Sequence, residues 1–301
     1  MYFKKTKNIF YNFFLLCIVA CGVIDGQAFS GKPKHEKRKH SVSKNPLSRI
    51  KKLAIKCKDV VEEGVDWCVY SGKVFKLFIK HNGTVGAITE SSPFLVREIT
   101  RSVQWLVKNS ERPIKVLEIG SGPGCVSKHI AKLLRPCDRL DVVEVLLPFF
   151  EMTVDRVSPV IADESNGGCK NIYFYLSPFE DWKKPTGIRK YDVVITTVPY
   201  TQIPPEVSRQ HLEIIPKLLK KGGFLTHIKY VFADEYSKRR LTEKELAEYL
   251  VKRDFFENWV LEKFDPVKWV KKVMVSMGEF DDGQLVRANF PSSYVIHGRK
   301  K

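Results

Sequence analysis

The segment that most constrains this chain is a short apolar run that leads into a glycine-rich turn at residues 116–125. It reads Val-Leu-Glu-Ile-Gly-Ser-Gly-Pro-Gly-Cys, with glycines at Gly120, Gly122 and Gly124. Glycine permits a tight turn and lets the backbone approach a ligand closely. The residues before the turn have strand character, and residues 127–134 after it have helical character. The segment therefore predicts a strand–turn–helix unit with a ligand at the turn.

Strand-like and helix-like segments alternate through the body of the chain. Apolar runs predict strands at residues 114–119, 140–145, 172–176, 191–196 and 224–231, and amphipathic stretches predict helices at residues 94–108, 127–134 and 207–219. This alternation predicts an α/β fold with a parallel sheet and helices on both faces. Further strands near residues 270–277, 285–289 and 293–297 would complete the sheet, with a helical insertion near residues 233–262.

Two acids stand at positions where a nucleoside ligand would need them. Glu118 lies on the strand before the turn, and Glu144 ends the next strand, twenty residues after Gly124. An acid in the second position can accept both hydroxyls of a ribose. A dinucleotide site would need the spacing G-x-G-x-x-G, but the third glycine here comes one residue early. This spacing disfavours a nicotinamide enzyme, and a turn that serves only packing remains as an alternative.

The order E-x-G-x-G-x-G, which runs from Glu118 to Gly124, resembles the nucleoside-binding loop of class I S-adenosylmethionine (SAM)-dependent methyltransferases. The resemblance implies a Rossmann-like fold with a mostly parallel seven-stranded sheet, SAM as the cofactor and methyl transfer as the reaction. It also implies that Glu118 helps to hold the aminoacyl end of the cofactor, and that Gly120, Ser121, Gly122 and Gly124 form the loop beside it.

Three further segments, at residues 84–93, 196–200 and 285–292, narrow the resemblance. They read Thr-Val-Gly-Ala-Ile-Thr-Glu-Ser-Ser-Pro, Thr-Thr-Val-Pro-Tyr and Leu-Val-Arg-Ala-Asn-Phe-Pro-Ser. Together with the glycine turn they resemble the soluble-type bacterial phospholipid N-methyltransferases, over roughly residues 74–298. The resemblance implies that a membrane phospholipid, phosphatidylethanolamine, is both the methyl acceptor and the surface on which the enzyme acts.

The first of these segments contains two hydroxyl side chains and one departure from the family pattern. The resemblance places Ser91 and Ser92 near the carboxylate of the cofactor, and either hydroxyl could also cap the helix that follows. Glu90 stands where these enzymes commonly have a proline. A second departure follows the third strand, where Ser177 replaces the acid that binds the adenine amino group, so that Glu180 or Asp181 would have to substitute.

The loop after the fourth strand helps to distinguish between possible methyl acceptors. We assign Thr197 to the cofactor side of this loop and Pro199 and Tyr200 to the acceptor side. The rRNA adenine N6-dimethyltransferases, which share the fold, have Asn at the position of Thr197, and RNA adenine methylation is therefore the alternative function. Tyr200 could instead face a lipid ammonium through cation–π attraction. His227 is the candidate base on the fifth strand, and Tyr230, near the end of the same strand, is a second candidate. A membrane-tethered SAM-binding protein without turnover is a third possible function.

Most of the net positive charge belongs to the N-terminal part of the chain. The formal charge is +17, from 51 Lys and Arg and 34 Asp and Glu. Residues 1–58 hold 14 Lys and Arg and two acids, whereas residues 59–301 hold 37 and 32 and are only mildly basic. No Phe, Tyr or Trp lies between residues 31 and 58, so that stretch lacks a stacking platform for bases. The charge therefore gives no strong indication of nucleic-acid binding.

The first 58 residues have the composition of a membrane segment followed by a basic arm. An apolar run at residues 9–24 is shorter than the roughly 20 residues of a usual span. Eleven Lys and Arg at residues 32–58 follow it, against three lysines before it, which predicts a membrane-associated protein with its catalytic domain in the cytoplasm. The alternative is a signal peptide, with export or lipoprotein formation after cleavage near Cys21.

These features divide the chain into a signal-like or anchor segment at residues 1–30, a basic linker at residues 31–72 and a methyltransferase domain at residues 73–301. The seven cysteines contain no C-x-x-C pair, which argues against a zinc ribbon, and we expect no metal. The sequence does not determine the oligomeric state.

Overall fold

A computed structural model of the chain describes residues 63–74, 76–77, 90–163, 168–200, 203–230, 263–266, 283–286 and 293–301. The predicted anchor, most of the basic linker, residues 84–89, the 233–262 insertion and the 270–277 strand lie outside the described residues. The chain divides into two units, Met1–Val69 and Tyr70–Lys301. Residues 63–69 of the first unit are helical, and the second unit contains the sheet.

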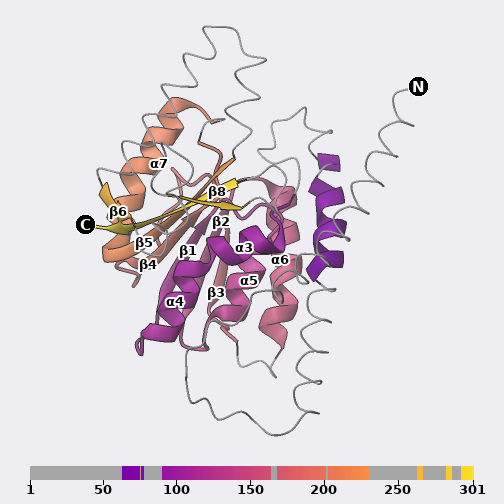
Figure 1. The fold of residues 1–301 in the computed structure, drawn as a ribbon, viewed down its shortest axis with the longest axis horizontal. Helices are drawn as coiled ribbons and strands as arrows, with labels where there is room; N and C mark the ends of the chain where they lie inside the picture. The colour runs from indigo at the N-terminus through magenta and orange to yellow at the C-terminus, as the bar shows by residue number, and fades with distance from the viewer. Residues whose placement is uncertain are drawn as a thin grey trace, which may run out of the picture. The chain divides into compact units, whose positions relative to one another are not determined.

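One mixed sheet of eight strands forms the centre of the second unit (Figure 1). Its order is β3-β2-β1-β4-β5-β8-β6, and β7 also pairs with β8. The strands are β1 (Lys115–Ile119), β2 (Arg139–Glu144), β3 (Ile172–Leu176), β4 (Tyr191–Thr196), β5 (Leu219–Tyr230), β6 (Phe264–Pro266), β7 (Gly283–Val286) and β8 (Ser293–Lys300). Strands β1 to β5 pair in parallel, and β8 is antiparallel to β5, β6 and β7. The mostly parallel α/β sheet is therefore confirmed, although eight strands are described where seven were expected.

Helices cover both faces of the sheet, as the alternating pattern predicted. They are α3 (Pro93–Ile99), α4 (Arg101–Asn109), α5 (Cys125–Leu133), α6 (Leu147–Ala162) and α7 (Pro205–Leu218). Successive residues of a strand point to opposite faces. Val116 accordingly packs in one core cluster with Ile130 of α5, whereas Leu117 packs in a second cluster with Leu212 of α7.

The predicted helix at residues 94–108 is two helices, divided at Thr100, whose φ of −88° and ψ of 5° depart from helical values. The Thr100 N–H still donates to the carbonyl of Val96 at 3.1 Å, and the Thr100 hydroxyl donates to the same carbonyl at 2.9 Å. The helix predicted at residues 207–219 is α7, which begins at Pro205 and ends at Leu218. Leu219 already pairs with Tyr191 in the sheet, and Gly222, with φ of 72°, lies in the irregular stretch that follows.

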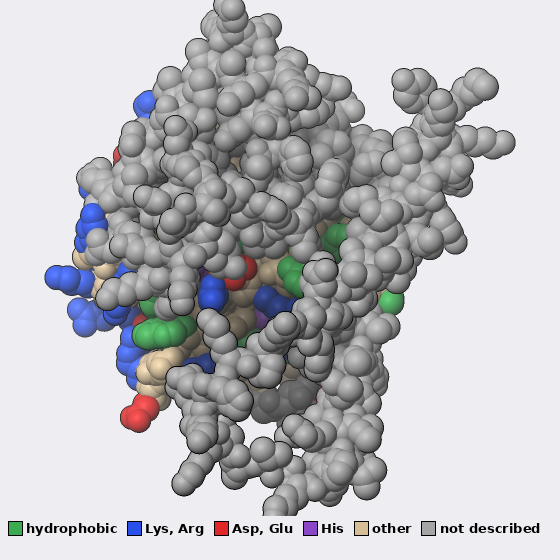
Figure 2. Space-filling view, viewed as in Figure 1, with side chains coloured by type: hydrophobic (Ala, Val, Ile, Leu, Met, Phe, Trp, Pro, Cys, Tyr) green, Lys and Arg blue, Asp and Glu red, His purple; other side chains and the backbone are tan. Residues whose placement is uncertain are grey.

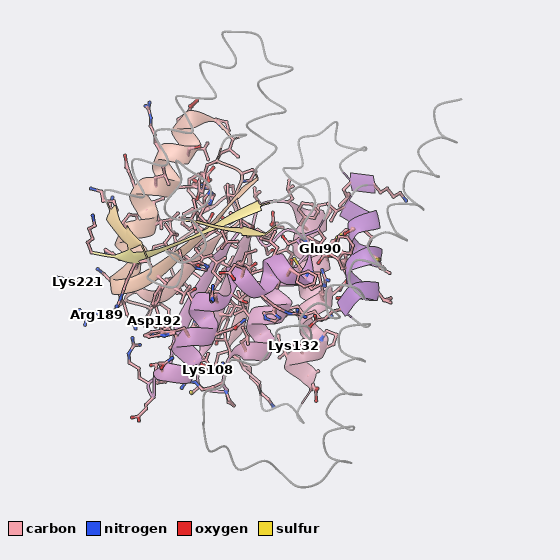
Figure 3. The ribbon with its side chains drawn as sticks, viewed as in Figure 1. Glu90, Lys108, Lys132, Arg189, Asp192 and Lys221 are labelled. Carbon is pink, nitrogen blue, oxygen red and sulfur yellow. The ribbon has the colours of Figure 1, made fainter. Side chains whose placement is uncertain are left out.

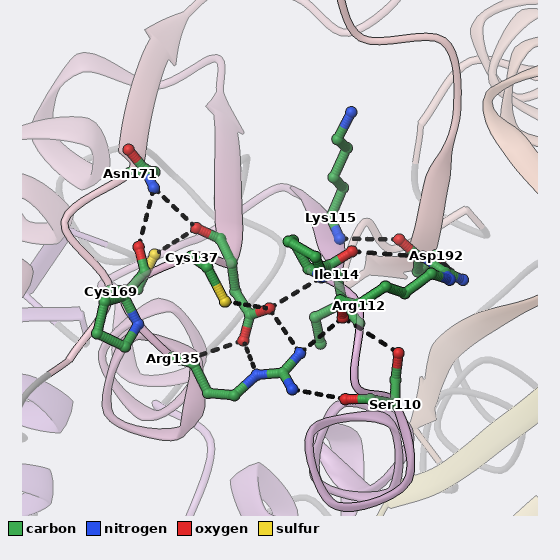
Figure 4. Close-up of polar contacts among 12 residues, drawn as sticks. Ser110, Arg112, Ile114, Lys115, Arg135, Cys137, Cys169, Asn171 and Asp192 are labelled. Atoms are coloured by element: carbon green, nitrogen blue, oxygen red, sulfur yellow. Dashed lines mark hydrogen bonds and ion pairs between the residues drawn. The ribbon is translucent and has the colours of Figure 1, made fainter.

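Two buried aspartates organise the amino ends of the parallel strands (Figure 4). Asp138 accepts from the backbone N–H of Ile114 at 2.8 Å and pairs with Arg135. Asp192 accepts from the N–H of Lys115 at 2.9 Å and pairs with Arg112 and Lys220. These carboxylates therefore satisfy strand ends and basic side chains at the edge of the sheet opposite the glycine turn.

Basic side chains are exposed at this same end of the sheet. Lys108, Arg189 and Lys221, which Figure 3 labels, are all exposed, and Figure 2 shows Lys and Arg side chains gathered on the left of the described surface. Among the described residues, no helix has both the length and the apolar character needed to span a membrane.

Candidate functional site

The turn between β1 and α5 uses its glycines for two different physical reasons. Gly120, Gly122 and Gly124 all have positive φ angles, of 75°, 55° and 83°. A Cβ on Gly124 would lie 2.7 Å from the Cα of Thr153, so α6 leaves no room for a side chain there. A Cβ on Gly122 would meet no atom within 4 Å. Close packing therefore requires glycine at 124, whereas the space beside Gly122 is open to a ligand.

Thr153 of α6 forms hydrogen bonds to the glycine turn. Its hydroxyl donates to the carbonyl of Gly122 at 2.9 Å and lies 3.0 Å from the hydroxyl of Ser121. On the other side, the N–H of Gly120 donates to the carbonyl of Val143 at 2.8 Å. Thr153 was not among the predicted site residues, because no helix was predicted at residues 147–162.

Glu118 is buried at the end of β1 with its side chain on the α5 face. Its Oε2 accepts from the Ser127 hydroxyl at 2.6 Å. Its Oε1 has no hydrogen-bond partner among the described residues. Burial raises the pKa of this carboxyl to about 8, against the lowering effect of the Ser127 bond. A buried carboxyl oxygen without a donor fits a site that receives a cationic group.

Glu144 closes the other side of the turn, at the carboxyl end of β2. Its Oε2 accepts from the N–H of Gly122 at 2.8 Å and from the Ser121 hydroxyl at 3.5 Å. Its Oε1 accepts from the N–H groups of Val145 and Leu146, both at 2.9 Å. Burial raises the pKa of Glu144, and these donors oppose the increase. The structure thus brings together Glu144, Ser121 and Gly122, three of the predicted cofactor-binding residues.

An apolar surface lies next to Glu144, at the carboxyl ends of β2 and β3. Val145, Leu146 and Leu176 are exposed by 56%, 40% and 47%. Of the two acids expected to replace the missing adenine ligand, Glu180 pairs instead with His211, whose Nε2 lies 2.9 Å from its Oε2. The second acid, Asp181, is exposed, and the Ser177 hydroxyl donates to the carbonyl of Pro178. The exposed apolar side chains were missed because an apolar residue after a strand is ordinarily assigned to the core.

The loop after β4 is bonded directly to the glycine turn. The Thr197 hydroxyl donates to the carbonyl of Gly120, and the Thr197 N–H donates to the carbonyl of Ile119 at 3.1 Å. Pro199 is half-buried, whereas Tyr200 is 5% exposed. The predicted cofactor-side and acceptor-side segments therefore meet at Thr197.

Tyr200 packs among aromatic and imidazole rings beneath this loop. Its hydroxyl lies 3.1 Å from the Thr196 hydroxyl, and burial raises the pKa of the phenol well above its usual value. Its ring centroid lies 5.4 Å from that of His227 and 5.8 Å from that of His211. The predicted acceptor residue and the predicted base are thus neighbours, while the side chain of Tyr230, a second candidate base on β5, is not described.

The predicted serines before α3 have different environments. Ser92 caps α3, because its Oγ accepts from the N–H of Leu95 at 3.3 Å, whereas Ser91 is half-buried beside it. The preceding residue, Glu90, forms a buried ion pair with Arg156 of α6. Capping by Ser92 is confirmed, and the contact between Glu90 and Arg156 was not predicted. Within the described ranges, no group of three or more His, Cys, Asp or Glu side chains could hold a metal ion.

No protein-family model matches the chain. A curated relative is the ornithine lipid N-methyltransferase of Singulisphaera acidiphila, which is 26% identical over 164 residues, covering 54% of this chain and 77% of the relative. Two similar solved structures are the N-methyltransferase NodS from Bradyrhizobium japonicum with S-adenosylhomocysteine and the magnesium protoporphyrin IX methyltransferase ChlM from Synechocystis with SAM. The NodS structure has a TM-score of 0.44 and 15% sequence identity, and the match covers 69% of this chain and 88% of NodS. The ChlM structure has a TM-score of 0.45 and 13% sequence identity, and the match covers 69% of this chain and 80% of ChlM.

Proposed function

We propose that this chain, a class I SAM-dependent methyltransferase, N-methylates the head group of a membrane lipid, with phosphatidylethanolamine as the first candidate acceptor. The curated relative carries the proposal, because it is an N-methyltransferase of a lipid and aligns with 54% of this chain. Ornithine lipid, on which that relative acts, is the second candidate within the same class of acceptor.

The residues around the glycine turn suit the cofactor. The Oε1 of Glu118, which has no donor among the described residues, would accept from the ammonium group of SAM, and this would satisfy a buried carboxyl oxygen. Glu144 would accept from the ribose, in place of the Ser121 hydroxyl, which at 3.5 Å is the most distant of its present donors. Val145 and Leu146 would offer apolar surface to the adenine.

The chain has a small chemical task once the cofactor is bound. SAM supplies an activated methyl group, so the protein need not build a nucleophile. The chain must hold the acceptor nitrogen close to that group. An ammonium head group must first lose a proton, because only the neutral amine has a free lone pair. We assign His227 as the base that accepts this proton. Pro199 and Tyr200 would line the acceptor side of the pocket.

The environment of Thr197 favours a lipid over RNA. An adenine methyltransferase of this fold presents an amide oxygen from this position to the target amino group. Here the Thr197 hydroxyl donates to the carbonyl of Gly120 and is held against the glycine turn. RNA adenine methylation therefore stands as the second candidate, and the assay below includes it.

We also propose a cellular location for the protein. The apolar run at residues 9–24 and the basic arm at residues 32–58 suit attachment to an anionic membrane, with the catalytic domain in the cytoplasm. Export after cleavage near Cys21 is the alternative. Membrane fractionation followed by protease treatment of intact cells separates the two, since only an exported domain is digested.

Radiolabelled methyl transfer by the full 301-residue chain tests the proposed function. Vesicles of phosphatidylethanolamine, vesicles of ornithine lipid and unmodified RNA are offered in parallel, with phosphatidylcholine vesicles as the blank. We expect counts in at least one of the two methylatable lipids. Glu118→Gln should abolish them, whereas the matched change Glu111→Gln, on an exposed residue at the opposite end of the sheet, should not. Counts in RNA alone, or in no fraction, contradict the proposal.

A further inference from the structure

Two consecutive carbonyls of the glycine turn are held by one face of α6. Thr153 donates to the carbonyl of Gly122 at 2.9 Å, and Nη1 of Arg156 donates to the carbonyl of Pro123 at 3.2 Å. Residues three apart on a helix lie on the same face, so both donors reach the turn from the same side. The peptide between Gly122 and Pro123 has no N–H, because its nitrogen belongs to proline, and in the next peptide the N–H of Gly124 donates to the carbonyl of Ser121 at 3.1 Å. Thr153 and Arg156 therefore fix the direction of both carbonyls, and with it the conformation of the turn.

Arg156 reaches this position as part of a buried cluster. Its side chain is 5% exposed, and the side chain of its partner Glu90 is fully buried. The guanidinium also lies over the ring of Tyr70, with its Cζ 4.0 Å from the ring centroid. A guanidinium carries five donors in a rigid planar fork, so it can serve a carboxylate and a carbonyl at once. The arrangement connects the segment before α3 (Figure 3) with the glycine turn.

We propose that Arg156 is a positioning residue for the cofactor: Glu90 orients its guanidinium, and the guanidinium fixes the Pro123 carbonyl and with it the direction of the turn. Neither side chain touches the cofactor in this account. The inference requires only that the chain binds SAM and its product S-adenosylhomocysteine. It does not depend on which acceptor is methylated.

A purely structural role for the ion pair makes a different prediction. Removing one member of a buried pair leaves an uncompensated charge and destabilises the fold, whereas replacing both members by apolar residues of similar size is often neutral. The double variant Glu90→Met/Arg156→Met therefore separates the two roles. It removes both charges together, and it also removes the donor to Pro123.

Calorimetric binding of S-adenosylhomocysteine and thermal unfolding, both on the full chain, provide the test. We expect Arg156→Met alone to lower the melting temperature and to weaken binding. In the double variant we expect the melting temperature to return close to that of the wild type, while the dissociation constant remains about tenfold weaker, because one charged hydrogen bond to the turn is missing.

A matched control breaks a buried ion pair far from the turn. Arg135 pairs with the fully buried Asp138 at the amino ends of the strands. Arg135→Met should lower the melting temperature and leave the dissociation constant within twofold of the wild type. The proposal is overturned if the double variant binds S-adenosylhomocysteine like the wild type, or if Arg135→Met weakens binding as much. Failure of lipid methylation would appear in the methyl-transfer assay and leave these binding constants unaffected.

Discussion

The hydroxyl of Thr197 donates to the backbone carbonyl of Gly120, which bonds the loop after β4 to the glycine turn after β1. The two residues are 77 positions apart in the chain, yet their strands are neighbours in the sheet. A movement of the glycine turn would therefore reach the loop that carries Pro199 and Tyr200. In the proposed function, this bond would couple the cofactor side of the site to the acceptor side.

Removing that hydroxyl should weaken both the fold and the cofactor site. Thr197→Val keeps the side-chain shape but deletes the donor to Gly120, and we expect the free energy of unfolding to fall by about 1–3 kcal/mol. Thr197→Ser should recover most of the loss. Urea unfolding measures the stability, and calorimetry measures binding of S-adenosylhomocysteine. A Thr197→Val protein as stable as the wild type would show that the bond contributes nothing.

The buried carboxyl of Glu118 should make the stability of the free protein depend on pH. Burial raises its pKa from 4.5 to about 8, so the folded protein holds a proton that the unfolded chain releases between these values. The free energy of unfolding should therefore fall as the pH rises from 4.5 to 8, by up to about 1.4 kcal/mol per pH unit.

Glu118→Gln should remove this contribution, because its neutral amide does not titrate. The measurement is the difference in unfolding free energy between this variant and the wild type at pH 5 and pH 8, which we expect to shift in favour of the variant at pH 8. Binding of a cationic amine should also release a proton from the wild type at pH 7. An unchanged difference between the two pH values would contradict the assignment.

The open space beside Gly122 predicts that a single methyl group will interfere with cofactor binding. Gly122→Ala places a side chain at φ of 55°, a strain of about 1–2 kcal/mol. Gly187→Ala is the matched control, because Gly187 also has positive φ and a methyl group added there would likewise meet no atom within 4 Å. We expect both variants to lose similar stability and only Gly122→Ala to lose affinity for S-adenosylhomocysteine. Equal affinities would show that the cofactor lies elsewhere.

Tyr200 should contribute through its ring and not through ionisation. Its buried hydroxyl lies 3.1 Å from that of Thr196, and burial keeps the phenol protonated by raising its pKa. Tyr200→Phe should therefore cost about 0.5–1.5 kcal/mol of stability and retain most methyl transfer. Tyr200→Leu, which removes the aromatic ring, should lower turnover further. Loss of all turnover in Tyr200→Phe would instead make the hydroxyl essential.

Local patterns were enough to predict most of the described sheet. β3 and β4 have the predicted bounds, because each appears in sequence as a short, largely apolar run, although only β4 is buried along its whole length. Helix α6 was missed, since Pro148 and Pro159 interrupt its sequence, although one proline lies in the first turn and the other in the last. The three-residue strand β6 is too short to leave a recognisable pattern.

Some residues of the candidate site could be predicted from local sequence patterns, and others could not. The glycine conformations, Glu118 and Glu144 follow from spacing within one strand–turn–helix unit and the strand after it. Thr153, Arg156 and the partners of Thr197 do not, because they reach the turn from elements that only folding brings there. Glu180 shows the converse: its position after β3 suggested a ligand for adenine, but His211 of α7 pairs with it.

The sequence alone determined the order of the five parallel strands, the glycine turn and the two acids beside it, because backbone conformation and apolar periodicity are local properties. Only the tertiary structure decided which side chains hold the carbonyls of the turn, which acids already have partners and which apolar side chains remain exposed. Hydrogen bonds and ion pairs act over a few ångströms in space, and residues far apart in the chain come within that range only when the sheet and its helices have packed.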